Sequence, residues 1–195
     1  MIRLTKQKFE DPDTEYLAIP GNSLDVRTEE LLPLGEKTFN LESYLEGVGF
    51  SKEKRHVLGC LANNECLPFA DGSFDCYIAN LSLMLVDNHR NMLLEAHRVT
   101  QVGSTLAFTV WGRYENVQNF AILDDVMIKH GLKSKEPPKK SSYDLGKDPE
   151  ALRAEMETIG FTHIRIWYQP MNFNFRDAEA YCEAICQTNT IRVAL

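Results

Sequence analysis

The side chains best suited to proton transfer and metal binding are scattered along this sequence. The histidines stand singly, a pattern more typical of structural or solvated histidines than of catalytic ones. The five cysteines include no CxxC pair, and Cys182 and Cys186, one helical turn apart, have no further metal ligands that we can place. We therefore predict no metal site and leave the catalytic residue unknown. Examples of these single histidines are His89, His97, His130 and His163.

A group of larger side chains offers more chemistry. Trp111, Arg113 and Tyr114 stand at the end of a stretch, 105–111, in which apolar residues alternate as they do in a strand. An aromatic face attracts a cation, so these side chains could line a ligand pocket. They could equally pack against the segment 133–147. The sequence leaves both interpretations open.

The composition is typical of one intracellular globular domain. A chain of 195 residues can build one sizeable core, and we predict a single domain over 1–195. No apolar run approaches the roughly 18 to 20 residues that a membrane span needs, and residues 1–10 lack the apolar core of a signal peptide. The odd cysteine count, with most cysteines in apolar stretches, suits reduced thiols. We expect a cytoplasmic protein that does not bind membranes.

The charge argues against a nucleic-acid partner. The formal net charge is −7, whereas phosphate binding relies on clustered Lys and Arg. The basic cluster within 133–140 lies beside prolines and serines, and is therefore typical of a solvated surface loop, with polyanion binding a minor alternative.

Strand-like and helix-like stretches alternate along the chain. The strongest strands, 74–81 and 105–111, flank a helix that we expect to begin at an Asp87 cap. Such alternation implies β-α-β units and a mainly parallel sheet with helices on both faces, an α/β three-layer sandwich. The other expected strands are 16–19, 37–41, 56–61 and 161–168, and the other expected helices follow Ser23 or Asp25, cover 115–130 and 177–186, and begin at Asp148-Pro149.

In such sheets a ligand binds at the carboxyl ends of the strands, near the switch in strand order. This rule selects positions by their place in the fold alone. The positions are 20–23, Glu42, Asn63 with Asn64, Asn80, and 111–113.

Two motifs resemble a known family. Residues 67–75 read LPFADGSFD and residues 95–106 read EAHRVTQVGSTL. They are similar, in sequence and in spacing, to the "LPFxDGSFD" and "E-x-x-RVLKPGG-x-L" segments of the type-11 class I methyltransferases, which use S-adenosyl-L-methionine (SAM) and include ubiquinone and menaquinone biosynthesis enzymes. Residues 152–166 resemble the family's late helix, turn and sixth strand. The resemblance covers about 63–167 and implies a Rossmann-like methyltransferase sheet.

The resemblance is poor over the first sixty residues, where the family binds its cofactor. Members carry Gly-x-Gly-x-Gly after an acidic strand end, because glycine lets the backbone approach the methionine part of SAM. Here the corresponding turn keeps Gly21, has Ala18 in place of the acid, and has Pro20, which removes a backbone donor. Gly21 is thus a degenerate remnant of the cofactor turn or a plain turn residue.

The resemblance implies four further cofactor contacts. Glu42 would accept hydrogen bonds from the ribose hydroxyls. Asn63, which with Asn64 aligns with the family's Gly-Asp-Ala segment, would accept from the adenine amino group, and Asn80 would face the methionine end. Each also has a structural interpretation, as a helix cap for Glu42, a loop pair for the two asparagines, and a strand end for Asn80.

Three hypotheses about function follow from the resemblance. The first is a small-molecule methyltransferase with a divergent SAM site. The second is a pseudoenzyme, a scaffold with this fold that no longer binds SAM and acts through a protein partner. The third is a truncated product, since the chain stops at 191–195 where a final strand would begin.

Overall fold

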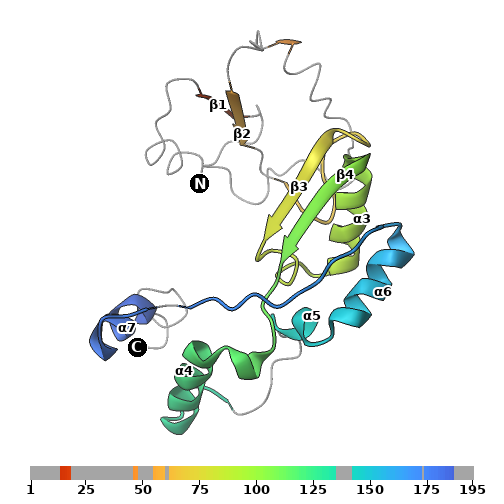
Figure 1. Ribbon diagram of the computed structural model, residues 1–195. Coiled ribbons are helices and arrows are strands. Elements are labelled where there is room, and N and C mark those ends of the chain that lie inside the picture. Colours follow the sequence, from red (N-terminus) through yellow and green to blue (C-terminus); the bar gives the residue numbers. More distant parts are fainter. Residues whose placement is uncertain are drawn as a thin grey trace. The chain divides into compact units, whose positions relative to one another are not determined.

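The computed structural model describes residues 14–18, 46–47, 55–59, 62–134, 142–172 and 174–186 (Figure 1). The chain divides into two compact units. The first unit comprises Met1–Val110 with Ala154–Thr162, and the second comprises Trp111–Arg153 with His163–Leu195. Whether the two form the single predicted domain stays a prediction.

The strands of the first unit form two parallel pairs. β1 (Thr14–Ala18) pairs with β2 (Arg55–Gly59), and β3 (Phe74–Asn80) pairs with β4 (Thr100–Thr109). Adjacent parallel strands need a crossover, and α3 (His89–Val99) supplies it between β3 and β4, as Figure 1 shows. The predicted α/β class with parallel, Rossmann-like strand–helix alternation is therefore confirmed.

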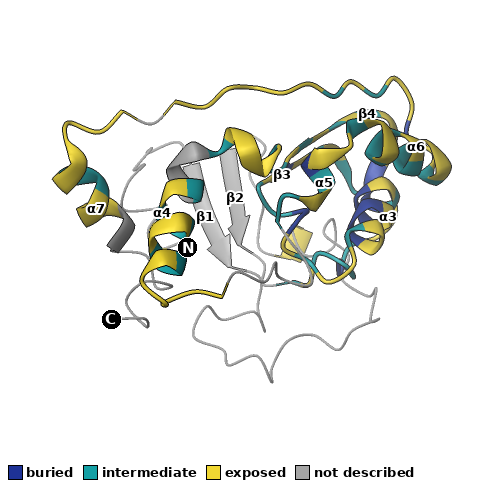
Figure 2. Ribbon diagram, turned by 90° about the horizontal axis from the view of Figure 1, so that it is seen from below, coloured by how far each residue is buried: buried dark blue, intermediate teal, exposed yellow. Residues whose placement is uncertain are grey.

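α3 carries the core of the first unit. The side-chain oxygen of Asn88 caps the helix by accepting from the backbone N–H groups of Arg90 and Asn91, so the predicted cap at Asp87 was wrong by one residue. In Figure 2 the colour for buried residues is concentrated on this helix. Burial of each large apolar side chain contributes roughly 1.5–3 kcal/mol to folding. The fully buried positions on its apolar face are Met92, Leu93, Ala96 and Val99.

The end of α6 (Pro149–Ile159) belongs to the first unit and packs on α3. The Nε2 atom of His89 lies 2.8 Å from the Glu155 carboxylate. Gly160 takes φ +113, as predicted for the helix stop, and brings Phe161 edge-on to the rings of His97 and Phe108. These contacts close the apolar layer around β4.

The second unit is helical. The predicted helix 115–130 is divided into a 3-10 turn η2 (Tyr114–Asn116) and α4 (Gln118–Lys129), and Gly131 ends it at φ +72, as predicted. The short α5 (Asp144–Lys147) precedes α6. Asp148 and Asp177 cap α6 and α7 (Ala178–Cys186) by accepting from backbone N–H groups, so both predicted starts are confirmed.

The predicted strand at 161–168 was wrong. The segment alternates half-buried and exposed side chains as a strand would, but it joins no ladder. His163 takes a left-handed φ of 53, which breaks the extended path, and the guanidinium of Arg153 donates to the Ile164 carbonyl that a ladder would need. Of the other predictions, the strand at 37–41 and the helix after Ser23 or Asp25 lie outside the described residues.

Candidate ligand-binding site

A hollow of about 360 Å³ runs along β3. Its lining includes the consecutive residues 76–80. Successive side chains of a strand point to opposite faces, so a cavity that meets all of them lies along the strand's edge. Within the part of the chain that the structure describes, β3 forms its ladder with β4 alone, so this edge has no strand beside it. The lining is Asn64, Leu67, Phe69, Phe74, Cys76, Tyr77, Ile78, Ala79, Asn80, Ser82 and Met92.

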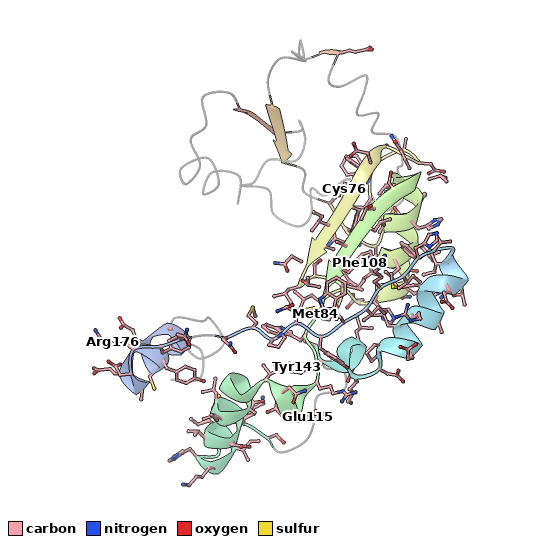
Figure 3. All side chains as sticks on the ribbon, in the orientation of Figure 1. Cys76, Met84, Phe108, Glu115, Tyr143 and Arg176 are labelled. Atoms are coloured by element: carbon pink, nitrogen blue, oxygen red, sulfur yellow. The ribbon has the colours of Figure 1, made fainter. Side chains whose placement is uncertain are left out.

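The wall of the hollow is neutral and largely apolar, and it includes the aromatic residues Phe69, Phe74 and Tyr77. None of the lining residues carries a charge, and the polar groups are two amides, two hydroxyls and the thiol of Cys76, labelled in Figure 3. Burial, and to a lesser extent the nearby Glu95 carboxylate, raises the pKa of Tyr77, which therefore stays a neutral phenol. Such a wall suits a flat, uncharged group that has a hydrogen-bonding edge.

The carboxyl end of β3 is held in a strained turn. Leu81 takes a left-handed φ of 50, which is unusual for a side chain of this size. Its N–H donates to both the carbonyl and the hydroxyl of Thr109 on β4, at 3.0 and 2.8 Å. The Thr109 hydroxyl in turn donates to the Asn80 side-chain oxygen. These bonds fix where Asn80 and Ser82 border the hollow.

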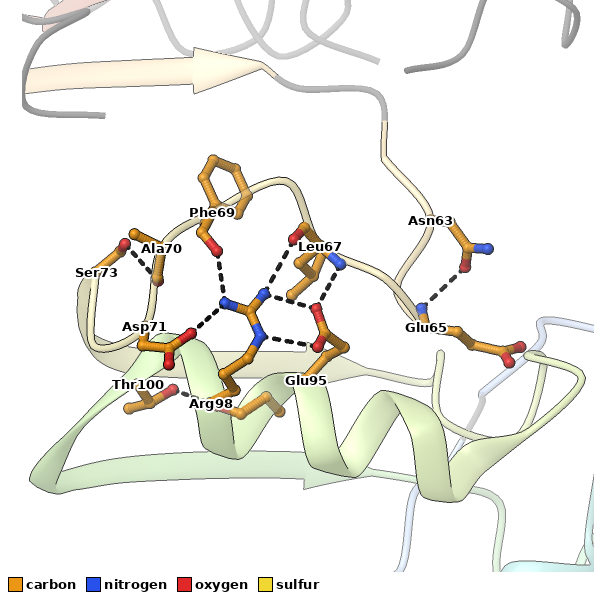
Figure 4. A network of polar contacts seen from close by, with 11 residues as sticks. Asn63, Glu65, Leu67, Phe69, Ala70, Asp71, Ser73, Glu95, Arg98 and Thr100 are labelled. Atoms are coloured by element: carbon orange, nitrogen blue, oxygen red, sulfur yellow. Dashed lines mark hydrogen bonds and ion pairs between the residues drawn. The ribbon is translucent and has the colours of Figure 1, made fainter. Parts of the chain in front are cut away.

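A largely buried ion pair between Glu95 and Arg98 binds the loop that carries Leu67 and Phe69 of the wall, as Figure 4 shows. Arg98 donates through Nε and Nη2 to both oxygens of Glu95, at 2.8 and 2.7 Å. Its remaining N–H groups reach the carbonyls of Leu67 and Phe69, at 3.0 and 2.7 Å, and the carboxylate of Asp71 at 2.7 Å. Glu95 also accepts from the Leu67 N–H at 2.7 Å. We call this set of contacts the Arg98 clamp.

The clamp joins the two motifs that carry the family resemblance. Glu95 and Arg98 belong to the second motif, and the groups that they bind, at 67–71, belong to the first. The hydrogen bonds to Glu95 raise the pKa of Arg98 further above its ordinary value, so the guanidinium is charged at any accessible pH. The clamp therefore gives a structural reason for the two motifs to occur together in one chain.

The structure brings together some of the predicted site residues. Asn64 and Asn80 both line the hollow. Asn63 is exposed, is not among the lining residues, and accepts from the Glu65 N–H at 2.9 Å. Gly21 and Glu42 lie outside the described residues.

The sequence did not lead us to the aromatic residues of the hollow's wall or to the Arg98 clamp. One signal could have revealed the clamp, because Glu95 lies on the apolar face of α3, three residues after Met92 and three before Arg98. A carboxylate on a buried helix face is rarely left unpaired. An acid there, one turn from an arginine, indicates a buried ion pair.

The group that follows β4 lies in the second unit, where it packs against residues of 142–147. Tyr114 meets Tyr143 edge-on, with 5.2 Å between ring centres, and donates to the Asp124 carboxylate at 3.1 Å. Burial, with Asp124 as the next cause, raises the pKa of Tyr114 to about 12. Lys133 forms an ion pair with the other oxygen of Asp124.

A close backbone approach completes this packing. Gly146, which is buried, lies so near Trp111 that a Cβ atom would stand 2.0 Å from the Trp111 carbonyl oxygen. The Tyr168 hydroxyl donates to the Gly146 carbonyl at 2.8 Å, and Arg113 lies over the Tyr168 ring at 5.3 Å. Of the two interpretations of this group, the structure therefore shows the packing one within the second unit.

The comparisons with known proteins agree with the motifs. The sequence profile of the "Methyltransferase domain" family matches residues 27–108, which include Glu42, Asn63, Asn64 and Asn80 but exclude Gly21. The match begins earlier and ends earlier than the resemblance at 63–167. No curated protein matches this chain. No described helix is long and apolar enough to cross a membrane.

Several solved structures are similar to this chain, among them the following two. One, from Thermotoga maritima, is described as a SAM-dependent methyltransferase and possible histamine N-methyltransferase; it is 21% identical, with 83% of this chain and 70% of that one covered and a TM-score of 0.35. The YcgJ protein of Bacillus subtilis is 14% identical, with 98% and 80% covered and a TM-score of 0.40. The particular likeness to ubiquinone-pathway enzymes stays a prediction. On the profile match and the motifs, this chain is methyltransferase-like and resembles the class I SAM-dependent methyltransferases.

Proposed function

We propose that this protein transfers a methyl group from SAM to a small-molecule acceptor. The observation that carries the proposal is that every residue lining the hollow falls within 27–108, the segment that matches the methyltransferase domain. The hollow also borders the carboxyl end of β3, and parallel α/β sheets bind their ligands at such ends.

The hollow's wall fits the neutral part of SAM. The rings of Phe69, Phe74 and Tyr77 offer apolar faces to a purine, and the amide of Asn64 can donate and accept at its edge. The wall has no charged side chain, so partners for the charged methionine end must come from elsewhere in the chain. We assign the wall to the adenosine part, except for Asn80 at the strand end, which would face the methionine part.

When bound, SAM supplies a methyl group that is already activated by its sulfonium. The protein's own task is then to hold the acceptor in line with that methyl, and positioning supplies much of the rate. The carboxyl end of β3, where Asn80 is hydrogen-bonded and lies beside the strained Leu81, is a rigid platform for this purpose. A general base is needed only for an acceptor that must lose a proton, and we assign none.

The remaining sequence predictions enter as part of the proposal. Glu42 would accept from the ribose hydroxyls, and Gly21 would let the backbone approach the methionine part. Asn63 would accept from the adenine amino group; its oxygen already accepts from Glu65 but has a second lone pair.

Thermal shift with SAM and with S-adenosylhomocysteine tests the proposal. A ligand at 100 times its Kd adds about 2.7 kcal/mol to the free energy of unfolding, which raises the Tm measurably. Glu42→Ala should abolish the shift, whereas Glu46→Ala, which removes an exposed carboxylate nearby in the sequence, should leave it intact. The absence of any shift at millimolar cofactor would contradict the proposal.

A second candidate function is a scaffold that no longer binds SAM and contacts another protein. The observation in its favour is that the side-chain oxygens of Asn63 and Asn80 already bind groups of the chain itself, as they would in a purely structural role. The same titration separates the two candidates, because the scaffold predicts that neither cofactor shifts the Tm.

A further inference from the structure

We propose that Glu95 and Arg98 are positioning residues for the ligand of the hollow, because they fix the wall that Leu67 and Phe69 form. The inference rests on the proposed function in one respect, namely that the hollow receives part of the ligand. It assigns a role in binding to two side chains that do not line the hollow themselves.

The contacts carry the argument. Both backbone polar groups of Leu67 are hydrogen-bonded: its N–H donates to Glu95 and its carbonyl accepts from Arg98. The Phe69 carbonyl accepts from Arg98 as well. The side chains of these same two residues line the hollow, so each wall residue is fixed through its own peptide group.

The rest of the loop is anchored by the same helix. The Gly72 N–H donates to the Arg98 backbone carbonyl at 2.9 Å, just before β3 begins at Phe74, another wall residue. A rigid wall lowers the cost of ordering the site when a ligand arrives. The clamp therefore pre-forms the hollow.

The geometry requires arginine at this position. A guanidinium presents five N–H donors in a planar fork, and here they serve two carbonyls and two carboxylates from a side chain that is only 14% exposed. A lysine would keep the charge but bring three donors on one atom, so it cannot hold Leu67, Phe69 and Glu95 in the same arrangement. Asp71 is 80% exposed and contributes least.

The test compares Arg98→Lys with Leu93→Val in the full chain. Leu93 is fully buried on the same helix but does not line the hollow, so its variant lowers stability without touching the wall. Hydrogen–deuterium exchange is followed for peptides covering 67–74 and 149–159, and S-adenosylhomocysteine affinity is measured by calorimetry. Glu95→Gln, which keeps the size of the side chain, is a second variant in case Arg98→Lys folds poorly.

We expect Arg98→Lys to speed exchange at 67–74 by about tenfold while 149–159 stays near the wild-type rate, and to weaken the affinity per folded molecule by about tenfold. Leu93→Val should speed exchange at both peptides alike and leave the affinity unchanged. Equal effects of the two variants on both readouts would overturn the inference.

The two proposals fail in different ways. A wild-type chain that binds neither SAM nor S-adenosylhomocysteine contradicts the proposed function, and the inference about ligand positioning falls with it. If the wild type binds but clamp variants bind equally well, only the positioning role is refuted. Localised faster exchange at 67–74 with weaker binding supports both.

Discussion

The two units are stabilised by different kinds of contact. In the first, the apolar face of α3 is fully buried, and the Glu95–Arg98 pair of the Arg98 clamp is largely buried. In the second, Ile122 and Val126 of α4 are 58% and 49% exposed, and the contacts among its described residues include aromatic pairs and a close backbone approach. The segment 27–108 that matches the family lies within the first unit and ends within β4, so the match falls in the unit that contains the described buried core.

The largest effect should come from Arg98→Met. The substitution leaves Glu95, whose side chain is 11% exposed, without its cation. Breaking a buried pair by removing one partner costs about 3–5 kcal/mol, because the remaining charge is uncompensated. Urea denaturation should show this loss in the free energy of unfolding. The matched variant Asp71→Asn should cost less than about 1 kcal/mol, because that carboxylate is 80% exposed; equal costs would contradict a buried pair.

Gly146→Ala is the corresponding change in the second unit. The new Cβ would meet the Trp111 carbonyl oxygen at 2.0 Å and the Gly112 Cα at 2.8 Å, and backbone atoms cannot swing aside as a flexible side chain can. We expect a loss of about 3 kcal/mol, the upper range for overpacking, in thermal unfolding followed by circular dichroism.

Gly131→Ala is the control for this substitution. Gly131 has φ +72 but open space where a Cβ would stand, so only its left-handed backbone is penalised, by about 1 kcal/mol. A Gly146→Ala variant no less stable than Gly131→Ala would show that the close approach at Trp111 is not a real constraint.

A smaller effect is expected for Thr109→Val, at the carboxyl end of β3. The valine removes the hydroxyl that accepts from the Leu81 N–H and donates to Asn80, but the Leu81 N–H keeps its bond to the backbone carbonyl. A loss of about 1 kcal/mol in urea denaturation is therefore expected. If the turn positions Asn80 for a ligand, Thr109→Val should also reduce the rise in Tm that the cofactor causes. An unchanged rise in Tm would indicate that Asn80 has no role in binding.

The strongest parts of the fold could be predicted from residue pattern. β3, α3 and β4 follow from alternating and helical spacing, because a strand or helix with one buried face needs that spacing. The strand at 161–168 failed for a reason that the pattern does not contain. Its side chains do alternate, but a strand also needs a partner strand and a regular extended backbone. The left-handed φ of His163 interrupts that backbone.

The site could be predicted only in part. The rule about strand ends selected Asn64 and Asn80, because it depends on topology alone. The aromatic residues of the wall and the contacts of the Arg98 clamp come from segments that are about 30 residues apart in the sequence, as Leu67 and Arg98 are. Local sequence patterns do not reveal such pairings. The acid on the apolar face of α3 was the one local signal.

The smallest expected effect is an alkaline loss of stability in the second unit, centred on Tyr114. Its pKa is about 12 in the folded chain against 10.0 ordinarily, because burial and the carboxylates of Asp124 and Asp125 disfavour the phenolate. A raised folded-state pKa means that this stabilising contribution is fully present below pH 10 and is lost as the pH rises toward 12. Tyr114 is 36% exposed, so solvent screening keeps the effect small.

Tyr114→Phe isolates this contribution. The phenylalanine keeps the edge-on ring contact with Tyr143 but cannot ionise, so the variant's Tm should fall less between pH 10 and 12 than that of the wild type. At neutral pH the variant should be slightly less stable, because the hydrogen bond to Asp124 is lost. Thermal unfolding across this pH range, with tyrosinate absorbance as the second readout, measures both. Parallel Tm curves for the two proteins would show that Tyr114 titrates as it does in the unfolded chain, which would contradict its raised pKa.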